Sequence, residues 1–248
     1  MEAPPPKPAF RFSLRWLLAM LTAASVLLAW FWSALQSARD AAQKYQEANN
    51  FKQVGLAFSD FHATNGYFPD SASARTSGEA IVSWRMKIAP YLEAETYYGQ
   101  YRYDEPWNSP SNSGICDFKH WIFCHHRAPE SSRFTHIMMP TGPGTVGEKP
   151  VTLDEITDQH DQTVLVMSLQ RSDILWHEPR DFSINEITRA RDNPDRILIR
   201  GRPFEGGYCA FVDGSGTQLP ADLKYDTLIA MLTIAGGEPV KFSWSDGH

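Results

Sequence analysis

The stretch WLLAMLTAASVLLAWFWSALQSA, residues 16–38, decides how this 248-residue chain is organised. It contains no charged side chain, and Arg15 and Arg39 flank it. A helix of about 20 apolar residues, rising 1.5 Å per residue, spans the roughly 30 Å hydrocarbon core of a bilayer. Aromatic residues stand near both ends, Trp16 at the first and WFW (residues 30–32) towards the second, as in the aromatic belts of membrane proteins. The stretch therefore predicts a transmembrane helix over residues 16–38.

The stretch has two other interpretations: a buried helix of a soluble core and a cleaved signal peptide. A basic segment precedes it, as in signal peptides, but the apolar part is long. Gln36 also stands where cleavage after Ala38 would need a small residue. We therefore expect an uncleaved anchor. Lys and Arg are equally frequent on both sides, so orientation rests on Arg11 and Arg15 beside the span. They favour a cytoplasmic tail (residues 1–15, Pro-rich) and an extracytoplasmic domain.

The helical pattern continues beyond the span. Apolar or small residues recur at intervals of three and four from Ala41 to Phe61, which predicts one stripe of a helix over residues 39–66. Asn65-Gly66 supplies a stop signal, and Pro69 follows it. One helix from about Leu14 to about Thr64 is therefore expected, with its first half in lipid and its second half against a head domain, residues 67–248.

The head domain combines helical and strand-like segments without βαβ alternation. A short helix with a kink at Pro90 is predicted within Ser83–Tyr98, turns within Asp104–Gly114, and a last helix over Ala221–Ala235. The expected fold class is α+β, with the long N-terminal helix packed on an antiparallel sheet. The predicted strands are Trp121–Cys124, Phe134–Met139, Thr163–Leu169, Ile174–Trp176 and Tyr208–Val212, the last leading into a hairpin turn, Asp213–Gly216.

Composition excludes several classes of protein. Apolar residues make up 42% of the chain, enough for a folded core, so most of the chain is not disordered. The net charge of −6 argues against a general nucleic-acid binder, which carries a basic surface. Three cysteines are too few for a disulfide scaffold. No catalytic signature is found, so we expect neither an enzyme nor catalytic or cofactor-binding residues.

Cys116, His120 and Cys124 are weak candidates for a metal site. They follow one another at four-residue spacing, and thiolate and imidazole ligands suit zinc or copper. The spacing matches no standard zinc finger, and a Cys116–Cys124 disulfide or simple burial of the thiols remains open.

Four other patterns have weaker functional interpretations. They are a glycine fingerprint (Gly142–Gly147), an acidic cluster with one histidine (Asp154–Asp161), the pair His177-Glu178, and an arginine-rich run (Arg189–Arg202). Their functional interpretations are, in that order, nucleotide binding, calcium binding, acid–base chemistry and the docking of an anionic partner. The expected interpretations are, in the same order, a glycine loop after a strand, a solvated helix face or turn, surface or core packing, and a solvated face.

Several motifs in the same order resemble the pseudopilin-like proteins abundant in planctomycete bacteria, which carry a prepilin-type N-terminal helix and a head domain of unknown function. The resemblance covers roughly residues 40–240. Its motifs are NNFKQVGLA (49–57), YFP (67–69), SWR (83–85), PYLE (90–93), YDEPWNSP (103–110), GPGT (142–145), ITD (156–158), GG (206–207), DGS (213–215) and GGE (236–238).

The resemblance implies a pseudopilin-like head and a structural or interaction role in the cell envelope. The expected protein is single-pass in the cell membrane, with its head on the periplasmic side. Its expected partners are membrane lipid, through residues 16–38, and other pseudopilin-like or envelope proteins, but not nucleic acid. The chain departs from the prepilin pattern because Arg11 stands at the processing glycine and Trp16 at the following acidic position. The alternative is a membrane-anchored ligand-binding module or metal-dependent enzyme.

Overall fold

The computed structural model describes residues 13–71, 82–92, 98–125, 128–169, 173–192, 207–220, 223–237 and 240. The chain divides into two compact units, Met1–Tyr45 and Gln46–His248. Most of the predicted N-terminal tail lies outside the described residues.

Helix α1 (Leu14–Asn65) confirms the single long helix predicted from the sequence. Its residues up to Tyr45 belong to the first unit, and those from Gln46 belong to the second. The helix ends as its sequence indicates. The side-chain amide of Asn65 donates to the carbonyl of Phe61, and Gly66, at φ 80°, donates its N–H to the carbonyl of His62. A positive φ favours glycine at this position, which explains the stop at Asn-Gly.

The second unit contains a four-stranded antiparallel sheet in the order β1-β3-β5-β6. The strands are β1 (Ile137–Met138), β3 (Val164–Ser168), β5 (Tyr208–Phe211) and β6 (Gly216–Gln218). The predicted hairpin turn joins β5 to β6. A short parallel pair, β2 (Pro140–Thr141) and β4 (Phe182–Ser183), lies outside this sheet. The antiparallel sheet and the long helix together confirm the α+β fold class.

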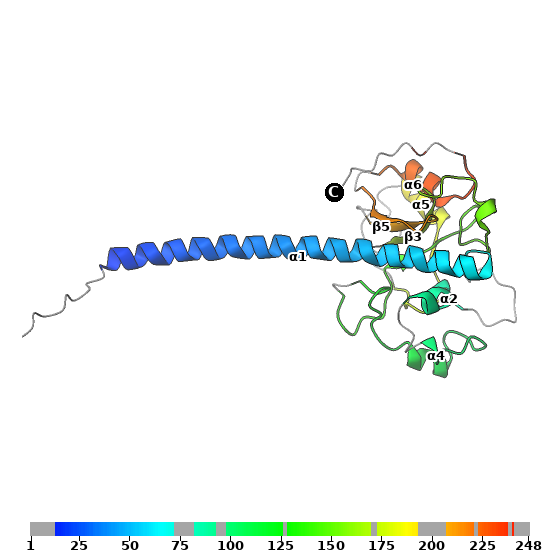
Figure 1. Ribbon diagram of the computed structural model, residues 1–248, viewed down its shortest axis with the longest axis horizontal. Helices are drawn as coiled ribbons and strands as arrows, with labels where there is room; N and C mark the ends of the chain where they lie inside the picture. Colours follow the sequence, from blue (N-terminus) through cyan, green and yellow to red (C-terminus); the bar gives the residue numbers. More distant parts are fainter. Residues whose placement is uncertain are drawn as a thin grey trace, which may run out of the picture. The chain divides into compact units, whose positions relative to one another are not determined.

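The two faces of the sheet pack against different layers. Val166 and Ala210 belong to the cluster that includes Phe51 of α1. Met167 and Cys209, the next residue pair in the register, belong to the cluster formed with α5 (Ile184–Asp192) and α6 (Tyr225–Leu232). This alternation is the two-residue period of a strand. Figure 1 shows the result: α5 and α6 lie on one side of β3 and β5, and the C-terminal part of α1 lies on the other.

Two glycines allow α1 and the β5–β6 hairpin to approach closely. A Cβ atom added to Gly55 would lie 2.7 Å from the carbonyl oxygen of Gly214, and one added to Gly216 would lie 2.8 Å from the backbone nitrogen of Lys52. Both distances are shorter than van der Waals contact, and both neighbours are backbone atoms that cannot rotate away. The NNFKQVGLA and DGS motifs therefore meet at a helix–hairpin contact that requires glycine on each side.

The remaining elements correct some of the sequence-based expectations. Short helix α2 (Trp84–Ile88) and the 3-10 turn Ala89–Tyr91 replace one longer helix. Helix α4 (Pro110–Ile115) forms where turns alone were predicted, because the hydroxyl of Ser109 caps its first turn. The strands predicted over Trp121–Cys124 and Ile174–Trp176 are only isolated bridges, Cys124 with Thr135 and Phe134 with Leu175. A further 3-10 turn covers Leu153–Glu155, and α6 is shorter than predicted.

Candidate functional site

The first unit presents a continuous apolar surface on α1. Its large apolar side chains with exposures between 47% and 71% are Leu14, Trp16, Leu17, Leu18, Met20, Leu21, Val26, Leu27, Leu28, Trp30, Phe31 and Trp32. Its most apolar 18-residue window has a mean hydropathy of 1.8 and is 0% buried. By length and composition this helix can cross a membrane as an anchor, or act as a signal sequence.

Polar side chains within this apolar surface bond to the helix's own backbone. The hydroxyl of Thr22 donates to the carbonyl of Ala19, that of Ser25 to Thr22, and that of Ser37 to Ser33. A hydroxyl that bonds within its own helix carries a small desolvation cost in hydrocarbon. The surface is therefore compatible with lipid around it.

The three candidate metal ligands lie in the head, and His120 has both ring nitrogens occupied. Its Nδ1 accepts from the backbone N–H groups of Ile122 and Phe123, at 3.2 and 3.4 Å. Its Nε2 therefore carries the proton of the neutral ring and donates to the Tyr98 hydroxyl. Burial lowers the pKa of His120 to about 3, so the ring stays neutral. These bonds leave no free nitrogen lone pair for a metal ion.

Cys116 and Cys124 are buried free thiols, and so is Cys209. Burial raises the pKa of Cys116 to about 12 and that of Cys124 to about 11, so both are thiols and not thiolates at neutral pH. In the part of the chain that the structure describes, no group of three or more His, Cys, Asp or Glu side chains is arranged to hold a metal ion. The geometry gives the metal hypothesis no support.

The cysteines provide a first prediction. All three thiols should resist maleimide at about pH 7.5 in the folded protein and react once it is unfolded in denaturant, because the thiolate is the reacting form and burial disfavours it. Mass spectrometry without reductant counts the added labels. Three labels only after unfolding are expected. If the unfolded protein from its native membrane takes up one label, at Cys209, and is two hydrogens lighter, Cys116 and Cys124 form a disulfide instead.

The glycine fingerprint is a turn that holds no helix N-terminus. Gly142 and Gly144 have φ values of 111° and 75°. The carboxylate of Glu148 accepts from the N–H of Gly144 at 2.8 Å, so an acidic group occupies the position that a phosphate would need. A Cβ on Gly147 would lie 2.3 Å from the carbonyl oxygen of Pro140. These glycines therefore allow the backbone conformation and close packing of a loop, as expected.

The residues of the acidic cluster bond to separate partners. The carboxylate of Glu155 accepts from the N–H of Thr152 and from Lys149, which lower its pKa to about 2. The carboxylate of Asp158 accepts from the N–H groups of Gly236 and Gly237, both at 2.9 Å. Glu155 and Asp158 therefore do not converge on one ion, and the ITD segment instead binds the two glycines of the GGE motif, Gly236 and Gly237.

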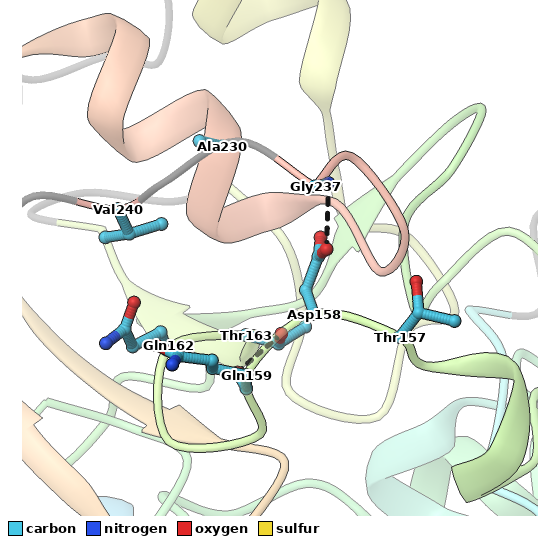
Figure 2. A pocket seen from close by; sticks show the side chains of 8 residues that line it. All are labelled: Thr157, Asp158, Gln159, Gln162, Thr163, Ala230, Gly237 and Val240. Atoms are coloured by element: carbon cyan, nitrogen blue, oxygen red, sulfur yellow. Dashed lines mark hydrogen bonds between the residues drawn. The ribbon is translucent and has the colours of Figure 1, made fainter.

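A cavity of about 330 Å³ lies beside this contact (Figure 2). The Asp158 carboxylate reaches Gly237 on one side of it, and Gln159 and Gln162 lie on the opposite side. Its other lining residues are Thr157, Thr163, Ala230 and Val240. Both carboxylate oxygens of Asp158 are already bonded to backbone, so they stabilise the loop.

His177 and Glu178 do not form an acid–base pair. Burial lowers the pKa of His177 to about 4, and its ring lies between those of Trp107 and Trp176, at 5.6 and 5.5 Å. Glu178 instead accepts from the N–H of Leu175 and from Arg180. Of the arginine-rich run, Arg189 and Arg191 lie on α5, and Arg191 pairs with Asp192 and Asp226. Arg196, Arg200 and Arg202 lie outside the described residues.

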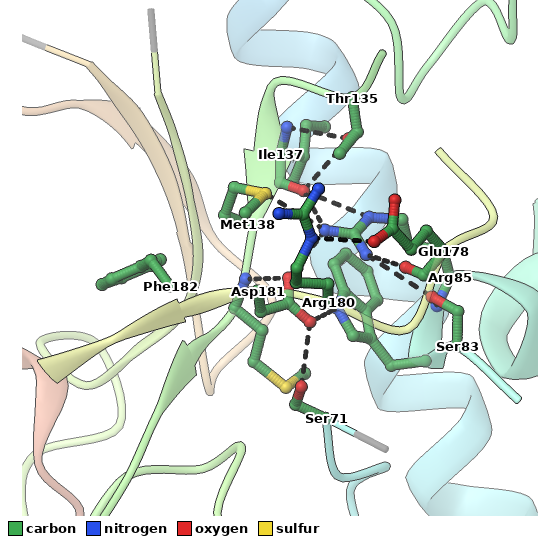
Figure 3. A network of polar contacts seen from close by, with 12 residues as sticks. Ser71, Ser83, Arg85, Thr135, Ile137, Met138, Glu178, Arg180, Asp181 and Phe182 are labelled. Carbon is green, nitrogen blue, oxygen red and sulfur yellow. Dashed lines mark hydrogen bonds and ion pairs between the residues drawn. The ribbon is translucent and has the colours of Figure 1, made fainter. Parts of the chain in front are cut away.

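A buried ion pair that the sequence did not indicate organises the centre of the head (Figure 3). Nη2 of Arg85 lies 2.6 Å from Oδ1 of Asp181, and both side chains are 0% exposed. The other oxygen of Asp181 accepts from Trp84 Nε1 and Ser71 Oγ, and Oδ1 also accepts from the N–H of Met139. Burial lowers the pKa of Arg85 and raises that of Asp181, and their mutual attraction opposes both shifts.

The remaining bonds of Arg85 go to backbone carbonyls and to neighbouring side chains. Its guanidinium donates to the carbonyls of Ile137 and Glu178 and to the hydroxyl of Ser83, and it stacks 4.5 Å from the Trp84 ring. The SWR motif therefore joins α2 to β1 and to the segment before β4. Since every polar atom is satisfied within the protein, this network is structural.

A second buried cluster, also missed from the sequence, joins α1 to the loop before β1. Oε2 of Glu47 lies 3.1 Å from Nε2 of His136, and both residues are 4% exposed. His125 Nε2 lies 3.7 Å from the other oxygen of Glu47, with its side chain 39% exposed. Glu47 and His136 are separated by 89 positions in the sequence, so no local pattern could indicate this contact.

Comparison with known protein families gives a match over the central part of the chain. The model of a family described as a protein of unknown function (DUF1559, SBP_bac_10) matches residues 36–172, more than half of the chain. The match covers the head-forming part of α1, the SWR motif, the three candidate metal ligands and β3. No curated protein and no solved structure matches the chain.

Proposed function

The chain belongs to the DUF1559 family of proteins of unknown function, and we propose that it is a single-pass membrane protein of the cell envelope with a structural or interaction role. Residues 16–38 would cross the membrane, residues 1–15 would lie in the cytoplasm, and the head would stand on the periplasmic side.

The observation that carries this proposal is the exposed apolar surface of α1. Unburied aliphatic and aromatic side chains over several helical turns are unfavourable in water, and their charge-free length fits a bilayer. The residues that follow in the same helix are buried in the head, as Phe51, Val54 and Phe58 show. One helix therefore supplies both an apolar surface and a core element of a folded domain.

We further propose that the protein is pseudopilin-like, which is supported by the layout of long helix and antiparallel sheet together with the motif resemblance. Several of those motifs have internal structural partners: Gly55 with Gly214, Arg85 with Asp181, and Asp158 with Gly237. Because these motifs stabilise the fold of the head, they give no information about an activity. Function has to be argued from a site. We accordingly propose an interaction role without catalysis.

Photocrosslinking in the native membrane tests this role. A benzoyl-phenylalanine at Trp32, which is 61% exposed, should crosslink to other polypeptides that carry a single N-terminal apolar span, or to a second copy of this chain. The same group placed at Leu153, on the surface of the head, reports contacts of the head alone. Comparing the two positions therefore distinguishes partners of the span from partners of the head. Crosslinks to lipid alone from both positions, from a protein that is monomeric in mild detergent, would contradict an interaction role.

A further inference from the structure

The cavity beside the contact between Asp158 and Gly237 has the features of a binding site (Figure 2). Its volume of about 330 Å³ lies within the range of small-molecule sites, roughly 300 to 1,000 Å³. Its described lining residues come from residues 157–163 and from the stretch between α6 and Val240, all within the second unit. The cavity therefore belongs to the head, and its role is independent of the anchor proposed above.

Backbone hydrogen bonds hold one wall of the cavity in place. The carbonyl of Gln159 accepts from the N–H groups of Gln162 and Thr163, at 3.0 and 2.9 Å, and also from the Thr163 hydroxyl. The carbonyl of Thr163 accepts in turn from the N–H of Val212, which follows β5, at 3.0 Å. The turn is thus fixed to the sheet without using the side chains of Gln159 and Gln162. A wall that is ordered before a ligand arrives lowers the entropic cost of binding.

Three polar side chains on this wall make no hydrogen bond within the described part of the chain. They are the carboxamides of Gln159 and Gln162 and the hydroxyl of Thr157. A carboxamide offers two N–H donors and an acceptor oxygen, and a hydroxyl both donates and accepts. Asp158 adds acceptors, because each of its carboxylate oxygens takes one backbone N–H and can accept a second hydrogen bond. The wall can therefore bond several donors and acceptors of one ligand.

We propose that this cavity binds a neutral saccharide. Among its described lining residues Asp158 alone is charged, and its negative charge disfavours an anionic ligand. The N–H groups of Gly236 and Gly237 already stabilise that charge, so the carboxylate does not require a cation. Ala230 and Val240 supply apolar surface for the C–H groups of a sugar ring. Sugar hydroxyls donate and accept without charge, which is the combination that the lining can bond.

Replacing Gln159 and Gln162 together by alanine tests the site. Neither side chain bonds within the described part of the head, so the double variant should keep the wild-type unfolding midpoint. Glucose and N-acetylglucosamine are titrated in turn into the full chain in detergent, and the methyl NMR signals of Ala230 and Val240 report binding. At least one of the two sugars should shift these signals saturably, with a millimolar dissociation constant. The double variant should bind that sugar at least about tenfold more weakly, because several hydrogen bonds are lost.

Gln46→Ala is the matched control, because Gln46 is an exposed carboxamide of α1 that does not line the cavity, and this variant should bind as the wild type does. Glucuronate, which carries a carboxylate, should bind more weakly than the neutral sugar. The proposal is overturned if neither neutral sugar gives a saturable shift up to roughly 100 mM. Unchanged affinity in the double variant, an equal loss in Gln46→Ala, or tighter binding of glucuronate would also overturn it. None of these results bears on the membrane anchor.

Discussion

Replacing Asp181 by alanine is expected to lower the free energy of unfolding of the head by about 3 to 5 kcal/mol, because it leaves the Arg85 guanidinium buried without its counter-ion. Trp84, Ser71 and the Met139 N–H would lose their acceptor as well. Asp181→Asn keeps a carbonyl acceptor of similar shape and removes the charge, so its effect should be smaller. Denaturant unfolding of the full chain in detergent, followed by tryptophan fluorescence, measures the difference.

The matched control is an ion pair on the surface. Arg191 bonds to Asp192 and Asp226 on the exposed side of α5, where solvent screens the charges. Arg191→Ala should leave the unfolding midpoint unchanged. A double replacement, Arg85→Met with Asp181→Leu, should recover part of the stability lost in Asp181→Ala, because no charge is then left buried. Equal losses in Asp181→Ala and Arg191→Ala would show that the buried network does not stabilise the head.

Two arginines in place of Leu27 and Leu28 are expected to remove the protein from the membrane. Both side chains lie near the middle of the predicted span and are 66% and 67% exposed, so the replacements disturb no packing in the head. One arginine near the centre of a spanning helix costs about 2.5 to 3.5 kcal/mol of insertion free energy on the translocon scale. The pair therefore costs roughly 5 to 7 kcal/mol. Alkaline extraction of membranes, followed by immunoblotting of pellet and supernatant, measures the loss.

Tyr45→Arg is the control for added charge. Tyr45 is 74% exposed on the same helix but lies beyond residue 38, so this variant should remain in the pellet with the wild type. If the double-arginine variant also stays in the pellet, the head or another segment holds the protein at the membrane, and the anchor assigned to residues 16–38 is wrong.

The sequence was most informative where a local pattern is sufficient. The charge-free run and the apolar stripe after it are periodic signals, so the extent of α1 could be predicted to within about two residues. Asn65-Gly66 marked the end of the helix because the positive φ required there favours glycine. Strand β3 and the β5–β6 hairpin were likewise marked by apolar runs and by the turn at residues 213–216.

Long-range contacts could not be predicted in this way. The partner of Arg85 lies 96 residues further along the chain, and the partner of Glu47 lies 89 residues away. The carboxylates concerned are those of Asp181 and Glu47. Neither belongs to a recognisable motif, and the pairing of each depends on the tertiary fold. At Cys116, His120 and Cys124, close spacing made a metal site a weak candidate beside a disulfide and simple burial. His120 bonds instead to Tyr98 and to its own backbone turn. The spacing of residues in the sequence does not show which ring nitrogens of a histidine are already hydrogen-bonded within the protein.

The intact mass of the protein purified from its native membrane tests the central claim most directly. An anchor formed by residues 16–38 predicts a chain that still contains this span, and in the uncleaved form a mass of 28.0 kDa. The measurement needs no variant and no assumption about partners. A mass that corresponds to a chain beginning near Arg39 would contradict the account, because the apolar part of α1 would then be a signal sequence that is removed.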